Sequence, residues 1–463
     1  MNMRQLGIAG VLAATLSACS LAPFYERPEK PVPDQFSYSQ DEVTSTAPTS
    51  WDQYFTEPEL QALINTALQN NRDLRITALR IEEARAQYGI QRADRLPTVN
   101  ATASYDRSKQ IFAQGTAFDV DQYRVGIAAS EFELDFFGRV KNLTNAALET
   151  YFATEEAQQT ARTSLITEVA VAYLNVRALT ERQSLAQETM QSREVTVART
   201  KRRLDAGIDT ALEYKTAELQ LETARAALAA IKREQVQAQS TLLLLLGEQG
   251  YKLPTTTEPL NTGSFTVIPA GVTSELLERR PDIRAAEHRL KSANANIGAA
   301  RAAFFPRVTL TTSAGLVNEN FFKLFSGSSD RAWAFSPQLT LPIFNYGRNQ
   351  SNLDLATVRK NIQVAEYEKV IQTAFKEVND VLGQKHQLDE QIVAQVRVTD
   401  AERERVRLAT RRFDRGVANY LELLDAQRSL FGAEQTLVQL KQLALTNSIN
   451  LFKVLGGEWK KKT

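Results

Sequence analysis

The sequence repeats itself at an offset of 209 residues (306−97), and this duplication constrains the fold more than any other feature. Insertions are normally tolerated in loops, so a register without gaps between residues 70 and 247 indicates that geometry fixes the length of every element. We therefore expect repeat 1 over residues 60–250, a linker over 251–268 and repeat 2 over 269–457. The matched positions include Pro97 and Pro306, Gly138 and Gly347, Glu168 and Glu377, and Gly207 and Gly416.

Each copy predicts a helix followed by two strands. The helices, of about 25 residues, are expected over 71–95 and 281–304, where Pro97 and Pro306 end them because proline cannot continue a helix. The strands alternate apolar and polar residues, and their length of about 10–12 residues suits a tilted transmembrane strand. Soluble hairpins packed on helices are the alternative. The strands are expected over 97–108, 123–134, 306–317 and 333–343.

The second half of each copy predicts a helical hairpin. A helix of about 65 residues, or roughly 98 Å, is expected over 138–203, and its counterpart over 347–412. Turns at Gly207 and Gly416 separate these from return helices over 210–246 and 419–455. The long helices and the return helices predict a helical cylinder with a crown of strands. The seam of the first long helix has heptad spacing, with Leu165, Val169, Ala172, Val176 and Leu179.

Four strands in one chain predict self-association. Four strands cannot close a barrel, and an open strand edge cannot exist in lipid because its backbone groups would lack partners. The smallest closed membrane barrels use about eight strands. Either two or three copies of the chain satisfy this requirement.

The N-terminus predicts a lipid anchor. Residues 1–18 are typical of a signal peptide, with Arg4 before a short apolar run. The lipobox Leu16 to Cys19 spans the predicted cleavage site after residue 18. Acylation is expected on Cys19, the only cysteine, and residues 19–59 would form a lipidated N-terminal segment. Ser20 in the following position favours the outer membrane. The alternative is an ordinary signal peptide. Residues 458–463 form a basic tail.

Composition argues against several classes of function. The net charge of +1 gives no general attraction to nucleic acid, and no partner of that kind is expected. His288 and His386, the only histidines, lie in different elements, and no phosphate loop or nucleophile elbow is found. The sequence predicts neither an enzyme nor a metal site, and no cofactor besides the lipid on Cys19.

Several motifs carry a resemblance that covers essentially the whole chain. Beside the lipobox, these are Leu134 to Arg139, Arg279 to Ile283, Ala299 to Pro306 and Arg411 to Phe431. The chain resembles the outer-membrane factors of the TolC superfamily, in particular the OprM-like lipoproteins of tripartite drug-efflux pumps.

The resemblance implies an α+β membrane protein that forms a homotrimer. Its barrel of about 12 strands would lie among outer-membrane lipids and continue into a periplasmic α-helical barrel. The partners would be a periplasmic adaptor (membrane fusion protein) and an inner-membrane pump of the resistance-nodulation-division class. The function implied is a passive exit duct for drugs and other small toxic compounds, with a gated periplasmic entrance.

The resemblance places that gate at Leu421 and Asp425. Both lie close to the Gly416 turn and share a helix face about 100° from the seam that begins at Ala426. Leucines off the seam could be buried against symmetry mates on the pore axis. Aspartates brought together there would repel and raise one another's pKa, hold cations and resist passive anion flow.

The resemblance also makes the hairpin turns contact sites for the adaptor. The residues concerned are Gly207 and Gly416 with their neighbours Ala206, Ile208, Arg415 and Val417. Positive φ at a turn explains the glycines without any partner. Arg411, Arg412 and Asp414, with Arg202, Arg203 and Asp205, are candidates for polar links that hold the tips shut; the alternative is a solvated charged face.

Three other functions compete with the drug duct. A TolC-like duct for type I protein secretion belongs to the same class. A structural coiled-coil lipoprotein of the envelope would explain the lipobox and the heptads but not four strands of membrane length. A lipid-anchored enzyme is opposed by the lack of a catalytic constellation.

Overall fold

The computed structural model describes residues 20–37, 50–111, 117–254, 258–261, 265, 274–327, 329–418 and 420–457. The predicted signal peptide, Cys19 and the basic tail lie outside these residues. The chain divides into two compact units. Unit 1 combines Met1–Glu29, Leu79–Glu156 and Arg284–Lys369, and unit 2 combines Lys30–Ala78, Ala157–Ile283 and Val370–Thr463.

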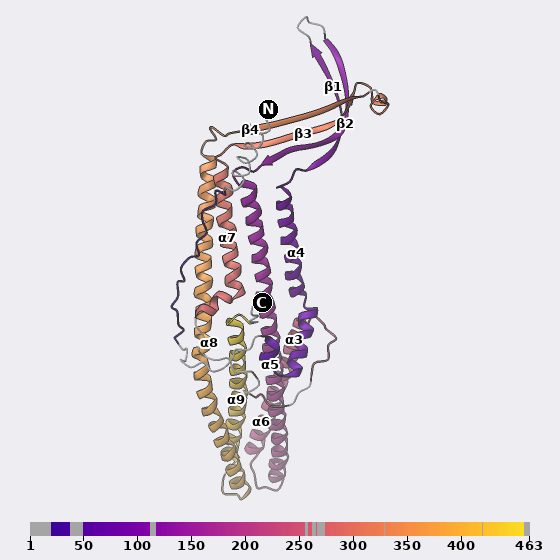
Figure 1. The fold of residues 1–463 in the computed structure, drawn as a ribbon. Coiled ribbons are helices and arrows are strands. Elements are labelled where there is room, and N and C mark those ends of the chain that lie inside the picture. The colour runs from indigo at the N-terminus through magenta and orange to yellow at the C-terminus, as the bar shows by residue number, and fades with distance from the viewer. Residues whose placement is uncertain are drawn as a thin grey trace. The chain divides into compact units, whose positions relative to one another are not determined.

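The strands of unit 1 form one antiparallel sheet in the order β1-β2-β3-β4 (Figure 1). One face of this sheet is apolar: Val125 pairs with Ala103 on one side and Leu316 on the other. The opposite face carries polar residues such as Ser104, which pairs with Arg124. The strands are β1 (Val99–Ile111), β2 (Ala117–Leu134), β3 (Arg307–Asn318) and β4 (Asp330–Thr340).

The predicted strand bounds were wrong at several ends. The first hairpin reaches further than expected, since β2 begins six residues before 123, because polar residues continue the ladder. Ser108 pairs with Val120, and Arg107 forms a 3.0 Å ion pair with Asp119 across the strands. The fourth strand begins and ends three residues earlier than predicted, and its last residue, Thr340, pairs with Arg307, the first residue of β3.

The long helices follow the repeat register closely. Helices α5 (Arg139–Asp205) and α8 (Arg348–Asp414) have 67 residues each and extend two residues beyond the predicted ends at 203 and 412. The return helices are α6 (Ala211–Leu246) and α9 (Tyr420–Val454). No described helix has the length and apolar character needed to cross a membrane.

The helix predicted over 71–95 starts within one residue of the prediction and ends two residues earlier than predicted. Helix α3 (Pro58–Asn70) ends where Asn71 adopts an extended conformation, and α4 (Arg72–Ala93) begins after it. Asn71 stabilises this break, because its side chain accepts a hydrogen bond from the Leu74 amide and donates one to the Leu245 carbonyl. In repeat 2 the counterpart α7 (Pro281–Ala302) follows a short 3₁₀ helix, η1 (Ser274–Arg279).

Unit 2 has an aromatic core beside the short helix α2 (Trp51–Tyr54). The Tyr54 side chain is 1% exposed, and its ring stacks on Phe452 with centroids 4.9 Å apart. Phe265 stacks on the same ring at 5.8 Å, and the Tyr54 hydroxyl donates a 2.7 Å hydrogen bond to the Ser448 carbonyl. This core joins the N-terminal part of unit 2 to α9.

Candidate functional site: the hairpin ends of unit 2

The two helical hairpins of unit 2 end in the same turn. Gly207 and Gly416 have φ of +69° and +70°, a left-handed conformation that favours glycine. In each turn the next residue donates a hydrogen bond to a carbonyl five residues earlier: Ile208 to Arg203 at 2.8 Å and Val417 to Arg412 at 2.9 Å. Both are Schellman turns, so the duplicated sequence builds duplicated tips.

An apolar cluster holds the two hairpins together beside these turns. Its members come from α6, α8 and α9, and Val197 of α5 packs against it. The cluster takes one face of α9, where Tyr420, Leu423 and Ala426 are buried. The buried members are Ala217, Ala409, Phe413, Tyr420, Leu423 and Ala426.

The predicted gate residues lie on the opposite side of α9 from this cluster. Leu421 is 62% exposed, and the Asp425 side chain is 48% exposed. The exposed leucine fits the predicted face, because its side chain has no burial partner of its own within this chain's apolar cluster. Leu212, the counterpart of Leu421 in repeat 1, is exposed as well, at 76%.

Asp425 is paired with two arginines within the chain. Its carboxylate accepts hydrogen bonds from Arg405 of α8 and, at 3.3 Å, from Arg428 one turn along α9. The hydrogen bond from Arg405, with the charges of both arginines, holds the pKa of Asp425 below its usual range. Within one chain, the pKa of Asp425 is therefore lowered, whereas aspartates facing one another would raise it.

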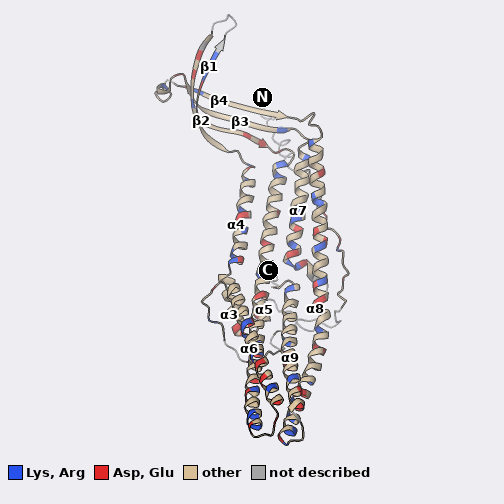
Figure 2. Cartoon of the chain, turned by 180° about the vertical axis from the view of Figure 1, so that it is seen from behind, with Lys and Arg blue, Asp and Glu red and all other residues tan. Residues whose placement is uncertain are grey.

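Polar contacts also join the two hairpins. Arg199 of α5 donates a 2.7 Å hydrogen bond to Asp414 of α8, and the buried Arg193 donates one of 2.5 Å to Gln427 of α9. Arg412 pairs with Glu422 at 3.1 Å across the second hairpin. Figure 2 shows both signs of charge gathered toward these hairpin ends.

The residues predicted to form polar links at the tips therefore make contacts of different kinds. Asp414 links the two hairpins, and Arg412 links the two helices of one hairpin. Arg203 pairs with Asp209 of its own hairpin and lies over the Phe413 ring, 5.6 Å from its centroid. Within the described part of the chain, Arg411 makes no ion pair. Its charge helps to lower the pKa of Glu404.

The six residues predicted to contact an adaptor are all exposed in this chain: Gly207, Gly416, Ala206, Ile208, Arg415 and Val417. Ile208 and Val417, at 66% and 70%, place two large aliphatic side chains at the tips.

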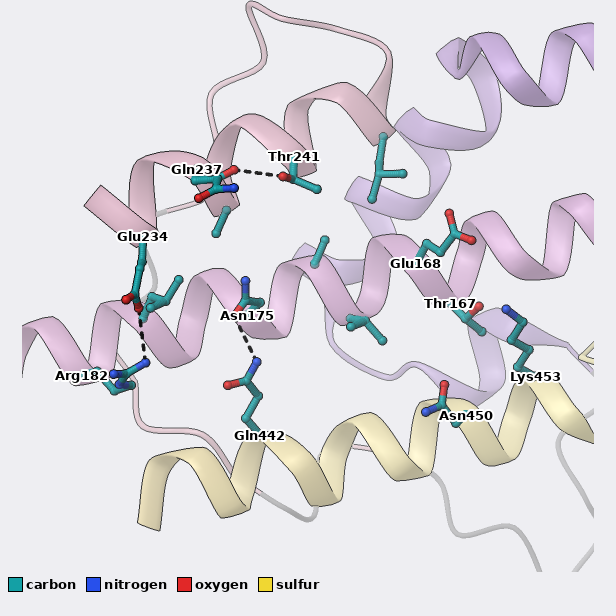
Figure 3. Close-up of a pocket in the computed structure, with 15 residues that line it drawn as sticks. Thr167, Glu168, Asn175, Arg182, Glu234, Gln237, Thr241, Gln442, Asn450 and Lys453 are labelled. Atoms are coloured by element: carbon teal, nitrogen blue, oxygen red, sulfur yellow. Dashed lines mark hydrogen bonds and ion pairs between the residues drawn. The ribbon is translucent and has the colours of Figure 1, made fainter. Parts of the chain in front are cut away.

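A pocket of about 680 Å³ lies further from the tips, between α5, α6 and α9 (Figure 3). Polar bridges cross it: Gln442 donates a 3.1 Å hydrogen bond to Asn175, and Arg182 pairs with Glu234 at 3.7 Å. Its lining includes Ala172 and Leu179 of the predicted seam, and Val171 beside them. The pocket contains none of the predicted gate or tip residues.

Sequence reasoning missed Arg193, Arg199, Arg405 and Arg428. The i, i+3 spacing of Asp425 and Arg428 was a usable signal. A hairpin turn at Gly416 also brings together residues at similar distances from it, such as Arg405 and Asp425, which are 11 residues before and 9 after (416−405 and 425−416). No spacing rule relates Arg199 to Asp414, because they lie in different hairpins.

Comparison with known proteins identifies the class. Residues 63–248 and 272–457 each match the family described as Outer membrane efflux protein. The two matches are offset by 209 residues (272−63), which is the register of the internal repeat. The chain belongs to this family, and it is an outer-membrane protein built from a tandem-duplicated unit of long helices and two strands.

Relatives match over nearly their whole length. Outer membrane protein OprJ of Pseudomonas aeruginosa is 45% identical over 469 residues, which cover 99% of this chain and 97% of OprJ. Antibiotic efflux pump outer membrane protein ArpC of Pseudomonas putida is 42% identical, covering 98% and 95%. Cation efflux system protein CusC of Escherichia coli is 41% identical, covering 96% and 98%.

The fold is likewise that of solved channels. The open state of the MtrE outer membrane channel of Neisseria gonorrhoeae superimposes with a TM-score of 0.86 at 39% identity. The alignment covers 96% of this chain and 99% of that one.

Proposed function

We propose that this chain is the outer-membrane channel subunit of a tripartite efflux system and acts as a passive exit duct for drugs and other small toxic compounds. The observation that carries the proposal is the full-length match to a family of efflux channels, in both halves of the chain. ArpC is named for antibiotic efflux and CusC for cation efflux, so relatives of similar identity carry different cargo.

The sheet supports self-association of the chain, and we propose a homotrimer. Within the described residues, β1 and β4 each have a strand neighbour on one side only. Such edges leave unpaired backbone groups, which a hydrocarbon environment does not tolerate. Three copies joined through these edges close a barrel of about 12 strands, inside the range of known membrane barrels. A periplasmic adaptor at the hairpin tips and an inner-membrane pump of the resistance-nodulation-division class complete the proposed system.

Two further features belong to the proposal. Cys19 carries the lipid anchor, which is supported by the lipobox and by its being the only cysteine. Leu421 and Asp425 form the periplasmic gate, which is supported by their shared exposed face beside the tip.

Two measurements test the function. Purified oligomers should form ion-conducting channels in planar bilayers; a protein that never conducts would support a structural envelope lipoprotein instead. Deleting the gene should increase susceptibility to drugs, and the intact gene should restore resistance. Loss of secretion of a reporter protein, with unchanged drug susceptibility, would support type I secretion.

The anchor has its own test. Cys19→Ser should abolish labelling by radioactive palmitate and leave an unprocessed precursor. Normal labelling of this variant would contradict the lipobox.

A further inference from the structure

The pocket between α5, α6 and α9 of unit 2 is large enough for an organic molecule (Figure 3). Its volume is about 680 Å³. Drug-sized ligands occupy pockets of about 300–1,000 Å³, which are mostly apolar with a few convergent polar groups. This pocket has the same composition, since aliphatic side chains lie beside amides, hydroxyls and charged groups. The aliphatic members are Val171, Ala172, Leu179, Ala238 and Leu245.

The pocket lies on the face of α5 opposite to a covering segment. On the covered face, Arg177 pairs with Glu57 at 2.6 Å, and Tyr173 donates a 2.8 Å hydrogen bond to the same carboxylate. The pocket residues Val171 and Asn175 precede Tyr173 and Arg177 by two positions each, which corresponds to a rotation of about 200° around a helix. The pocket therefore opens away from the segment that contains Glu57.

Four charged side chains line the pocket, and two of them neutralise each other. Arg182 pairs with Glu234 at 3.7 Å. Glu168 of α5 and Lys453 of α9 are exposed, and neither forms an ion pair with any residue in the described part of the chain. In Figure 3 the Lys453 side chain extends from α9 toward α5, the helix that carries Glu168. The pocket thus presents one free carboxylate and one free ammonium group from two different helices.

The duplication explains why Glu168 has no cation beside it. Its counterpart in repeat 2 is Glu377, which pairs with Arg280 at 2.9 Å. In repeat 1 the position of Arg280 is taken by Asn71 (280−209). Both residues donate a 2.8 Å hydrogen bond to a carbonyl at the end of the return helix of their own repeat. This contact is kept in both copies, whereas the charge that neutralises the glutamate is kept in the second copy only.

We propose that the pocket binds zwitterionic organic molecules of drug size, with Glu168 holding the cationic group of the ligand and Lys453 its anionic group. The aliphatic lining holds the apolar part of the ligand. A zwitterion gives both charges a partner, whereas a ligand with one charge is attracted by one of the two groups and repelled by the other. The proposal deepens the exit duct proposed above and rests on it, because cargo moves along the helix face that lies away from the covering segment.

Binding of three indole compounds to the intact detergent-purified oligomer tests the pocket. Tryptophan, tryptamine and indole-3-propionate share one apolar ring system, and at neutral pH they are a zwitterion, a cation and an anion. Saturation-transfer NMR should give tryptophan a Kd about twofold to fivefold lower than that of either analogue, as expected for ion pairs exposed to solvent. Empty micelles measured in parallel correct for partition into the detergent.

Variants of the two free charges assign the preference to this pocket. Glu168→Gln should abolish the difference in Kd between tryptophan and indole-3-propionate, and Lys453→Gln the difference between tryptophan and tryptamine. The exchanged pair Glu168→Lys with Lys453→Glu should again prefer tryptophan, because both charges are still present. Glu248→Gln and Lys232→Gln are matched controls that should leave all three Kd values unchanged, since both residues are exposed and do not line the pocket.

Two outcomes would overturn the zwitterion pocket: tryptophan that binds no more tightly than one of its analogues, or a preference that survives both single variants of the pocket. Conductance of the same preparations in planar bilayers tests the duct separately. Oligomers that bind tryptophan as expected but never conduct would contradict the proposed function and retain the pocket. Conducting oligomers that show no preference for tryptophan would contradict the pocket and retain the function.

Discussion

Arg199 of α5 donates a 2.7 Å hydrogen bond to Asp414 of α8, and this contact joins the ends of the two helical hairpins. Both side chains are about half exposed, at 46% and 48%. Ion pairs this exposed contribute about 0–1 kcal/mol, whereas the apolar cluster beside them is buried. The polar link is therefore the weaker of the two connections between the hairpins, and it is suited to break and re-form.

Removing this link should favour opening of the periplasmic end. We expect Arg199→Ala and Asp414→Ala each to raise the mean single-channel conductance, with the largest increase at low salt because screening already weakens the pair at high salt. The exchanged pair Arg199→Asp with Asp414→Arg should return conductance toward the original value. Lys201→Ala is the control, since its partner Asp205 lies in the same helix. Equal effects of Lys201→Ala and Arg199→Ala would contradict the assignment.

The predicted gate can be tested against its repeat counterpart. Leu421→Ala combined with Asp425→Ser should raise conductance severalfold and increase antibiotic entry into cells, because both side chains are removed from the proposed constriction. Leu212→Ala, at the related and also exposed position of repeat 1, should change conductance little. If the double variant conducts like the original protein, the constriction lies elsewhere.

Periodicity predicted the helical part of the fold well. In the predicted seam of α9, the residues spaced by seven, Ala426, Ala433, Leu440 and Asn447, are buried. Leu430, Leu437 and Ala444, which lie between them in the seam, are half-buried. The duplicated register also carried over to the ends of the long helices, which lie 209 residues apart (348−139 and 414−205). A repeated pattern of this length leaves few alternatives, because each copy must satisfy the same packing.

Several local features could not be predicted from the hydrophobic periodicity. Helix α3, before Asn71, was not predicted, and the Asn71 side chain donates a hydrogen bond to the Leu245 carbonyl, 174 residues away, a contact that no local propensity indicates. The extended first hairpin depends on cross-strand pairs of polar residues that read as loop. In the candidate site, the helix face of Leu421 could be predicted from its spacing to the seam. The arginine partners of Asp425 could not, because they depend on rotamers and on a neighbouring helix.

The aromatic core of unit 2 gives a prediction about stability. Tyr54→Ala should lower the free energy of unfolding by about 3–5 kcal/mol, because it removes a buried ring that stacks on Phe452. Tyr54→Phe keeps the ring and loses only the hydrogen bond to the Ser448 carbonyl, which corresponds to about 1–2 kcal/mol. Urea unfolding of the detergent-solubilised protein, followed by circular dichroism, measures both. Similar losses in the two variants would show that the hydroxyl, not the stacking, dominates.

The contact between the N-terminal segment and α7 should depend on pH through Glu287. Burial by itself raises the pKa of this carboxyl, but hydrogen bonds and charge from Lys291 and Arg27 outweigh it, and the net pKa is lowered. Tyr25 also donates to the same carboxylate, at 3.3 Å. Because the pKa is lower in the folded state, the stabilisation is present above the unfolded value of about 4.3 and is lost as the pH falls through the folded value.

Exchange of residues 20–30, corrected for its intrinsic dependence on pH, should therefore stay constant from about pH 8 to pH 5 and accelerate below about pH 4. Glu287→Gln lacks the charge at every pH, so its exchange should be fast throughout and independent of pH. Glu278→Gln is a suitable control, since Glu278 pairs with Lys30 further along the chain, outside unit 1. If acid acceleration persists in Glu287→Gln and disappears in Glu278→Gln, the segment is held by its later contact and not by Glu287.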